Sequence, residues 1–216
     1  VYQGAVSVGT LLEHGDFGLG TFEDLDGEMV VVDGKCYQAR GDGSVTVPDN
    51  AARVPFAVVT HFQPERTVSS PAIASFDDFV GYLDGLRNTE NMFFALRADG
   101  VFDYVKTRTV CKADGHETLV ESAGKQAEFE FENVRGTMVG FWTPEYAKAV
   151  NVAGYHLHFL TDDHQGGGHV LDCRSRGLTV GVEHSSDFRM AIPETPTFLR
   201  ADLSGDPSAD LEKAEH

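Results

Sequence analysis

The sequence has little cysteine, little positive charge and no long apolar run. Its three cysteines, Cys36, Cys111 and Cys173, are widely spaced and form no CxxC motif. This disfavours both a disulfide framework and a cysteine-based zinc site. Lys and Arg number 17 against 34 Asp and Glu, so the formal net charge is −17. Such a chain repels phosphate and anionic lipid, and we expect neither nucleic acid nor a membrane as its partner.

The longest apolar runs, residues 29–32 and 54–60, are far shorter than the roughly 20 residues of a membrane span. With 216 residues, 41% of them hydrophobic, the chain is long enough for one large domain or two small halves with a packed core. The sequence begins with Val1, which indicates that an upstream segment was trimmed. We expect a soluble cytoplasmic protein, and a secreted form stays open.

Turn and capping signals place the first elements. Asp33-Gly34 lies between residues 28–32 and residues 35–39 and predicts a tight hairpin. Ser75 precedes two acids and an apolar pattern at helical spacing, which predicts a helix from residue 76. Ala98-Asp99-Gly100 predicts a second hairpin, between strands 92–97 and 101–110.

Beyond residue 127 the pattern predicts short strands. They are expected at residues 137–142, 154–160, 169–173, 178–182 and 188–192. The fold class is therefore α+β, with two β-rich halves and a few helices. We place the halves at residues 1–112 and 113–216, with an extended tail at the end of the second half.

Three histidines in the second half have the spacing of metal ligands. His156 and His158 in the segment GYHLHF share one face of a strand, about 6.5–7 Å apart at Cα. His169 begins the next strand after three glycines, so it can lie beside the first two. Three neutral ligands with an open fourth position are typical of catalytic zinc. Three unrelated histidines are the alternative.

Two charged residues share strand faces with apolar side chains. Arg108 alternates with Phe102 and Tyr104, and a guanidinium there can clamp a carboxylate. Glu28 shares a face with Val30 and Val32, where an acid can serve in proton transfer. The alternatives are a paired surface arginine and a surface glutamate on an edge strand.

The segment at 136–170, GTMVGFWTPEYAKAVNVAGYHLHFLTDDHQGGGHV, resembles the bacterial acetolactate decarboxylases, as do residues 18–38, 54–62 and 102–110. The resemblance covers nearly the whole chain. It implies a zinc enzyme, usually a homodimer with a two-part α/β fold, that converts the small molecule 2-acetolactate to acetoin and carbon dioxide.

The resemblance also assigns roles to individual residues. It implies that zinc is held by His156, His158 and His169, the trio that the spacing indicates. The active-site arginine falls on Arg108 and the strand glutamate on Glu28, while Thr21 falls in the substrate pocket. A tail glutamate returns to the metal, matched by Glu215 or by Glu212. We expect Arg108 to hold the substrate carboxylate and either Glu28 or the tail glutamate to deliver the proton.

Two other functions stay open from the residues alone. A zinc hydrolase would use metal-bound water, with Glu28 as its general base. A non-catalytic cupin-like protein would bind a metal or a small acid. His158 followed by Asp162 faintly resembles the cupin pattern, but the glycine spacing expected before it is missing. No GxSxG motif supports a serine hydrolase.

Overall fold

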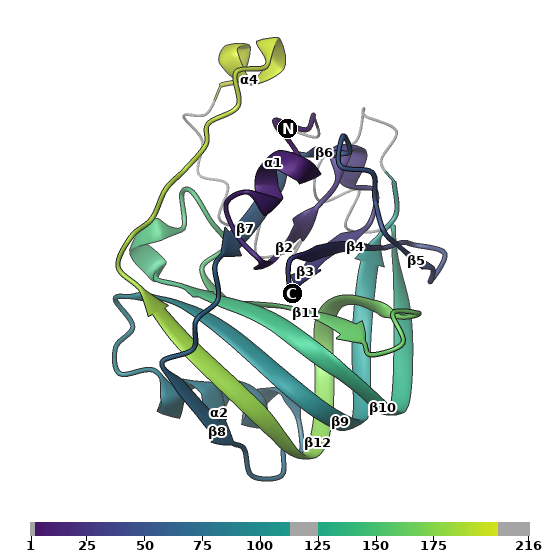
Figure 1. Cartoon of the computed structure of the whole chain (residues 1–216), viewed down its shortest axis with the longest axis vertical. Helices are drawn as coiled ribbons and strands as arrows, with labels where there is room; N and C mark the ends of the chain where they lie inside the picture. The colour runs from purple at the N-terminus through teal and green to yellow at the C-terminus, as the bar shows by residue number, and fades with distance from the viewer. Residues whose placement is uncertain (1–2, 113–124, 203–216) are drawn as a thin grey trace.

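The structure, a computed structural model, describes residues 3–112 and 125–202. Two antiparallel sheets pack face to face, with the N-terminal sheet above the longer strands of the second sheet (Figure 1). Strands dominate and the helices are few, so the α+β class is confirmed. In the described ranges no helix is long and apolar enough to cross a membrane.

The N-terminal sheet has five short strands. In spatial order they are β5 (Val45–Thr46), β4 (Lys35–Ala39), β3 (Glu28–Val32), β2 (Phe17–Thr21) and β7 (Phe56–Thr60). A two-stranded ribbon of β1 (Val6–Ser7) and β6 (Arg53–Val54), the helix α1 (Val8–Leu12) and the 3₁₀ turn η1 (Glu23–Leu25) accompany it.

The predicted hairpin between β3 and β4 is confirmed. Asp33 and Gly34 form its turn with φ values of 52° and 75°. Two successive positive φ values are what a type I′ turn requires, and Asp-Gly adopts them readily. The turn fixes the register in which Glu28 lies opposite Ala39.

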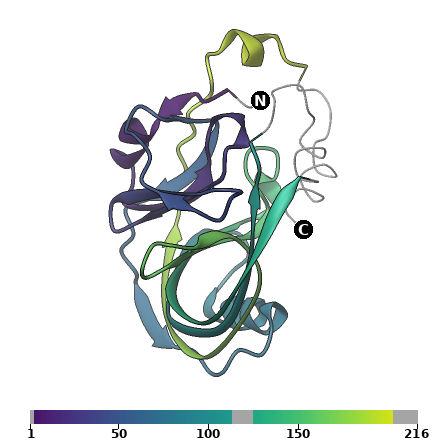
Figure 2. The same ribbon diagram turned by 90° about the vertical axis from the view of Figure 1, so that its right-hand side faces the viewer.

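The second sheet has long strands that curl. Its order is β11 (Gly154–Thr161), β10 (Gln126–Thr143), β9 (Phe93–Val110), β12 (Gly167–Ser185) and β8 (Arg66–Ser69). Because β11 pairs with β12 as well as with β10, four strands close into a small barrel, seen end-on in Figure 2. The remaining elements are α2 (Phe76–Leu86), η2 (Glu145–Ala147) and α4 (Pro196–Arg200).

The predicted hairpin at Ala98-Asp99-Gly100 is wrong. β9 runs straight through these residues because β10 and β12 pair with it on both sides there. The Asp99 carboxylate accepts hydrogen bonds from Arg97 and Thr137 side chains, so it is satisfied within the sheet and does not form a turn. Likewise, the strands predicted at 169–173 and 178–182 are one strand, β12, interrupted by bulges between them. The strand predicted at 188–192 is wrong, because the last strand of the sheet ends at Ser185 and the chain then leaves the sheet.

Three apolar clusters among the described residues form the core. One, which includes Phe17, Leu19 and Phe141, fills the space between the two sheets. A second packs α1 against the outer face of the N-terminal sheet. The third fills the barrel, and α2 packs against it through Phe79 and Leu83. The helix begins at Phe76 as predicted, and the Asp78 amide donates a hydrogen bond to the Ser75 side chain at its N-cap.

The described elements before residue 112 do not all belong to the first sheet. β8, α2 and β9 precede that residue and lie in or against the second sheet. The division of the chain at residues 112 and 113 stays a prediction.

Candidate metal centre

Strand register brings His158, His169 and Arg108 into one row. His158 on β11 lies directly opposite His169 on β12, and His169 lies directly opposite Arg108 on β9. Directly paired residues of antiparallel strands project from the same face of a sheet. His156 lies two residues before His158 and therefore shares that face as well. The N-terminal sheet covers this face. Leu160, two residues after His158 and on the same face, packs in the apolar cluster between the two sheets.

The three imidazoles converge. The Nε2 atoms of His156 and His158 are 3.1 Å apart, and His169 lies with its ring centroid 5.0 Å from that of His156. One nitrogen from each ring lies within 4.8 Å of the others, and all three residues are buried. Two nitrogens each about 2.0–2.1 Å from a tetrahedral ion lie about 3.3 Å apart, so the observed spacing fits a bound metal.

Two features prepare these rings as ligands. The Nδ1 of His158 lies 2.7 Å from the Met29 carbonyl oxygen. Because a carbonyl can only accept, Nδ1 carries the hydrogen and Nε2 presents its lone pair to the site. Burial, and to a smaller degree the positive charge of Arg108, lowers the pKa of His156 to about 3. The ring is therefore neutral at pH 7, as a metal ligand must be.

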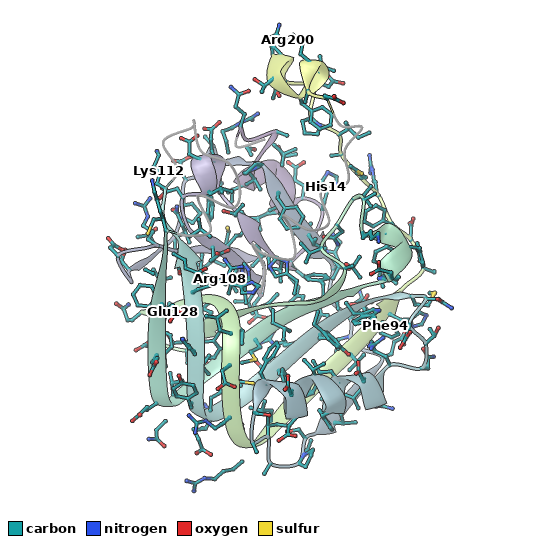
Figure 3. All side chains as sticks on the ribbon, turned by 180° about the vertical axis from the view of Figure 1, so that it is seen from behind. His14, Phe94, Arg108, Lys112, Glu128 and Arg200 are labelled. Atoms are coloured by element: carbon teal, nitrogen blue, oxygen red, sulfur yellow. The ribbon has the colours of Figure 1, made fainter. Side chains whose placement is uncertain are left out.

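Glu28 and Arg108 lie beside the histidines. One Glu28 carboxylate oxygen is 3.5 Å from His158 Nε2, and the other is 3.8 Å from an Arg108 guanidinium nitrogen. The Val110 amide also donates to Glu28, at 3.4 Å. Both side chains are buried, with residue exposures of 6% and 4%, so the surface alternatives for them are wrong. Figure 3 shows Arg108 at the junction between the N-terminal sheet and the long strands.

The remaining predicted site residues have different outcomes. Thr21 lies directly opposite Glu28 in the β2–β3 ladder, and its hydroxyl donates to the Gly27 carbonyl at 2.7 Å. The structure therefore places Thr21 next to Glu28 on the same face of the N-terminal sheet. Glu215 and Glu212 fall outside the described residues, so their roles stay predictions.

Two contacts of the site are absent from the sequence prediction. The Met29 carbonyl is a backbone group, which no residue pattern reveals. Phe56 on β7 lies beside His156 with ring centroids 6.2 Å apart and planes inclined by 12°. If the apolar run at 54–60 is taken as a strand, Phe56 shares one face with Val58 and Thr60, but the sequence does not show that this face lies toward the histidines.

The fold and the site together define a protein in which two β-sheets enclose a buried triad that can hold a metal ion, flanked by a carboxylate and a guanidinium. The model of one family, alpha-acetolactate decarboxylase, matches residues 1–205 of the chain. The chain belongs to that family, and it is accordingly an enzyme of the carboxy-lyase class.

Individual relatives agree with the family assignment. An alpha-acetolactate decarboxylase of Methanosarcina mazei is 42% identical over the whole chain, which spans 75% of that protein. One of Bacillus subtilis is 39% identical, again over the whole chain and 85% of the relative. A crystal structure of the Bacillus subtilis protein superposes with a TM-score of 0.95 at 38% identity, covering 100% of this chain and 93% of the other.

Proposed function

We propose that the protein decarboxylates 2-acetolactate to acetoin and carbon dioxide at a zinc ion held by His156, His158 and His169. One observation carries the proposal: a buried carboxylate, Glu28, lies between the buried histidine triad and a buried guanidinium, Arg108. The names of the relatives give the reaction, and they favour it over the zinc hydrolase and the cupin-like binder.

The residues fit zinc well. Imidazole is a ligand that zinc prefers, and a triad of neutral histidines leaves positions for a substrate. A divalent ion there would polarise the hydroxyl and ketone oxygens of the substrate and stabilise the negative charge that develops as carbon dioxide leaves.

Arg108 supplies the binding group for the substrate carboxylate. Its planar fork matches a carboxylate with two parallel hydrogen bonds, and burial strengthens such a contact. The site otherwise lies in a chain of net charge −17, which repels an anionic substrate. A buried positive charge beside the triad offsets that repulsion locally, and the β9–β12 ladder holds its backbone in place.

Glu28, in its protonated form, supplies the proton that replaces carbon dioxide on the reacting carbon. Its carboxyl group lies against His158. Glu28 belongs to the N-terminal sheet, whereas the histidines belong to the second sheet, so Glu28 approaches the triad from the opposite side. A carboxylic acid held on one side of the reacting carbon protonates one face of it, which yields a single acetoin enantiomer. Thr21 is the adjacent polar group of the row. A tail glutamate, Glu215 or Glu212, is the second candidate donor from the family resemblance.

The family resemblance also supports a homodimer. This is tested by the mass of the protein in solution, measured by light scattering. A monomer mass near 23.5 kDa would contradict it.

The reaction is tested by incubating the purified protein with racemic 2-acetolactate and following carbon dioxide and acetoin. We expect both products in equal amounts, with one acetoin enantiomer in excess. Turnover of ester or amide substrates, with no carbon dioxide from acetolactate, would contradict the proposal and favour the hydrolase.

A further inference from the structure

A row of four residues crosses the N-terminal sheet opposite the histidines. Thr21 lies directly opposite Phe56 in one ladder and Glu28 in the other, and Glu28 in turn lies opposite Ala39. Residues paired in this way project from the same face. Because Glu28 contacts His158 and Phe56 lies beside His156, that face is the one toward the metal centre.

The row differs in polarity from one end to the other. Phe56 lies beside His156, with nearly parallel rings at a centroid distance within the usual range for aromatic contacts. Glu28 lies beside His158 and Arg108. The centre therefore has a charged end, formed by Glu28 and Arg108, and an apolar end formed by Phe56, with the Thr21 hydroxyl between them.

This polarity matches the substrate of the proposed function, on which the inference rests. In 2-acetolactate one carbon carries a carboxylate, a hydroxyl, a methyl and an acetyl group. When the carboxylate is bound at the charged end by Arg108, the alkyl groups are left for the apolar end. Phe56 is a large, rigid side chain at that end, so it limits the length of the group that fits.

We propose that Phe56 is the specificity-determining residue of the site, and that its ring bounds the space for the alkyl substituent on the carbon that carries the carboxylate. The enzyme then prefers a methyl group over longer groups at this position. A difference of one methylene in an apolar pocket changes selectivity by roughly 10- to 200-fold, which sets the size of the effect to expect.

The test compares 2-acetolactate with its 2-ethyl homologue, each followed by release of carbon dioxide. Wild type, Phe56→Ala and Phe56→Leu are measured, and Val58→Ala is the matched control. Val58 shares the strand and the face of Phe56 but packs with the cluster between the sheets. Metal affinity of each variant is measured by competition with a chromophoric zinc chelator, and folding by circular dichroism.

We expect Phe56→Ala to raise the ratio of kcat/KM for the ethyl over the methyl substrate by about 10-fold or more. Phe56→Leu should raise it less, and should give the answer if the alanine variant does not fold. Zinc affinity should stay within about twofold of wild type, and Val58→Ala should leave the ratio unchanged.

Two results would overturn the inference while leaving the proposed function intact. One is an unchanged ratio in a folded Phe56 variant when wild type decarboxylates acetolactate. The other is an equal loss for both substrates together with weaker zinc binding, which would make Phe56 a support for His156. Failure of wild type to release carbon dioxide from 2-acetolactate would instead refute the proposed function.

Discussion

Arg108 and His169 occupy directly opposed positions in the β9–β12 ladder. A cationic side chain and a candidate metal ligand are thus fixed relative to each other by backbone pairing and do not depend on a loop. His158 extends the same row on the other side of His169. Placement on regular strands keeps the groups of a site close to their working geometry before any ligand arrives.

Replacing His169 tests the metal centre directly. His169→Ala removes one of three converging nitrogens, so we expect zinc affinity to fall on the order of 100-fold or more, with activity lost. His164→Ala is the control, because His164 is an exposed histidine of the same β11–β12 connection whose ring lies on Tyr37. Chelator competition and circular dichroism give the answer. Unchanged zinc affinity in a folded His169→Ala protein would refute the assignment.

Replacing Arg108 tests carboxylate binding. In Arg108→Ala we expect kcat/KM for acetolactate to fall roughly 100- to 1,000-fold, the effect of losing one preorganised charge-stabilising group. Arg108→Lys should recover part of this loss, since it keeps the charge but not the planar fork. Zinc content, measured by mass spectrometry of the metal, should be retained in both. Loss of the metal from Arg108→Ala would show that the arginine supports the centre and does not bind substrate.

Replacing Glu28 tests the proton donor. Glu28→Gln keeps the shape of the side chain and removes its acidic proton, so we expect kcat to fall roughly 100- to 10,000-fold with little change in KM. The exposed Glu145, which pairs with Lys148, provides the control variant Glu145→Gln. Steady-state kinetics with chiral analysis of acetoin measure the effect. A wild-type kcat in Glu28→Gln would show that another group donates the proton, and the tail glutamate is then the candidate.

The histidine triad could be predicted from the sequence because its geometry is local. Strand alternation puts His156 and His158 on one face, and a short glycine-rich connection returns the chain at His169. The burial of Glu28 and Arg108 could not be predicted, since it depends on how two sheets far apart in sequence pack together. The continuation of β9 through Asp99 could not be predicted either. The local pattern predicts a turn there, but the Asp99 carboxylate accepts hydrogen bonds from the Arg97 and Thr137 side chains within the sheet.

The cysteines provide a test of the packing. Burial raises the pKa of both Cys36 and Cys173 to about 12. At pH 8 the thiolate fraction of such a group is about 10⁻⁴, and only the thiolate reacts with alkylating reagents. We therefore expect native protein to be alkylated first at the half-buried Cys111, and at all three cysteines in denaturant. Peptide mass spectrometry distinguishes them. Rapid modification of Cys36 or Cys173 in native protein would contradict the described core.

The most direct test of the central claim is to remove the metal and restore it. The purified protein is dialysed against a chelator, and carbon dioxide release from 2-acetolactate is measured before and after one equivalent of zinc is added. We predict that activity is lost with the metal and returns as one zinc ion binds per chain. Full activity in protein shown to be free of divalent metal would contradict the account.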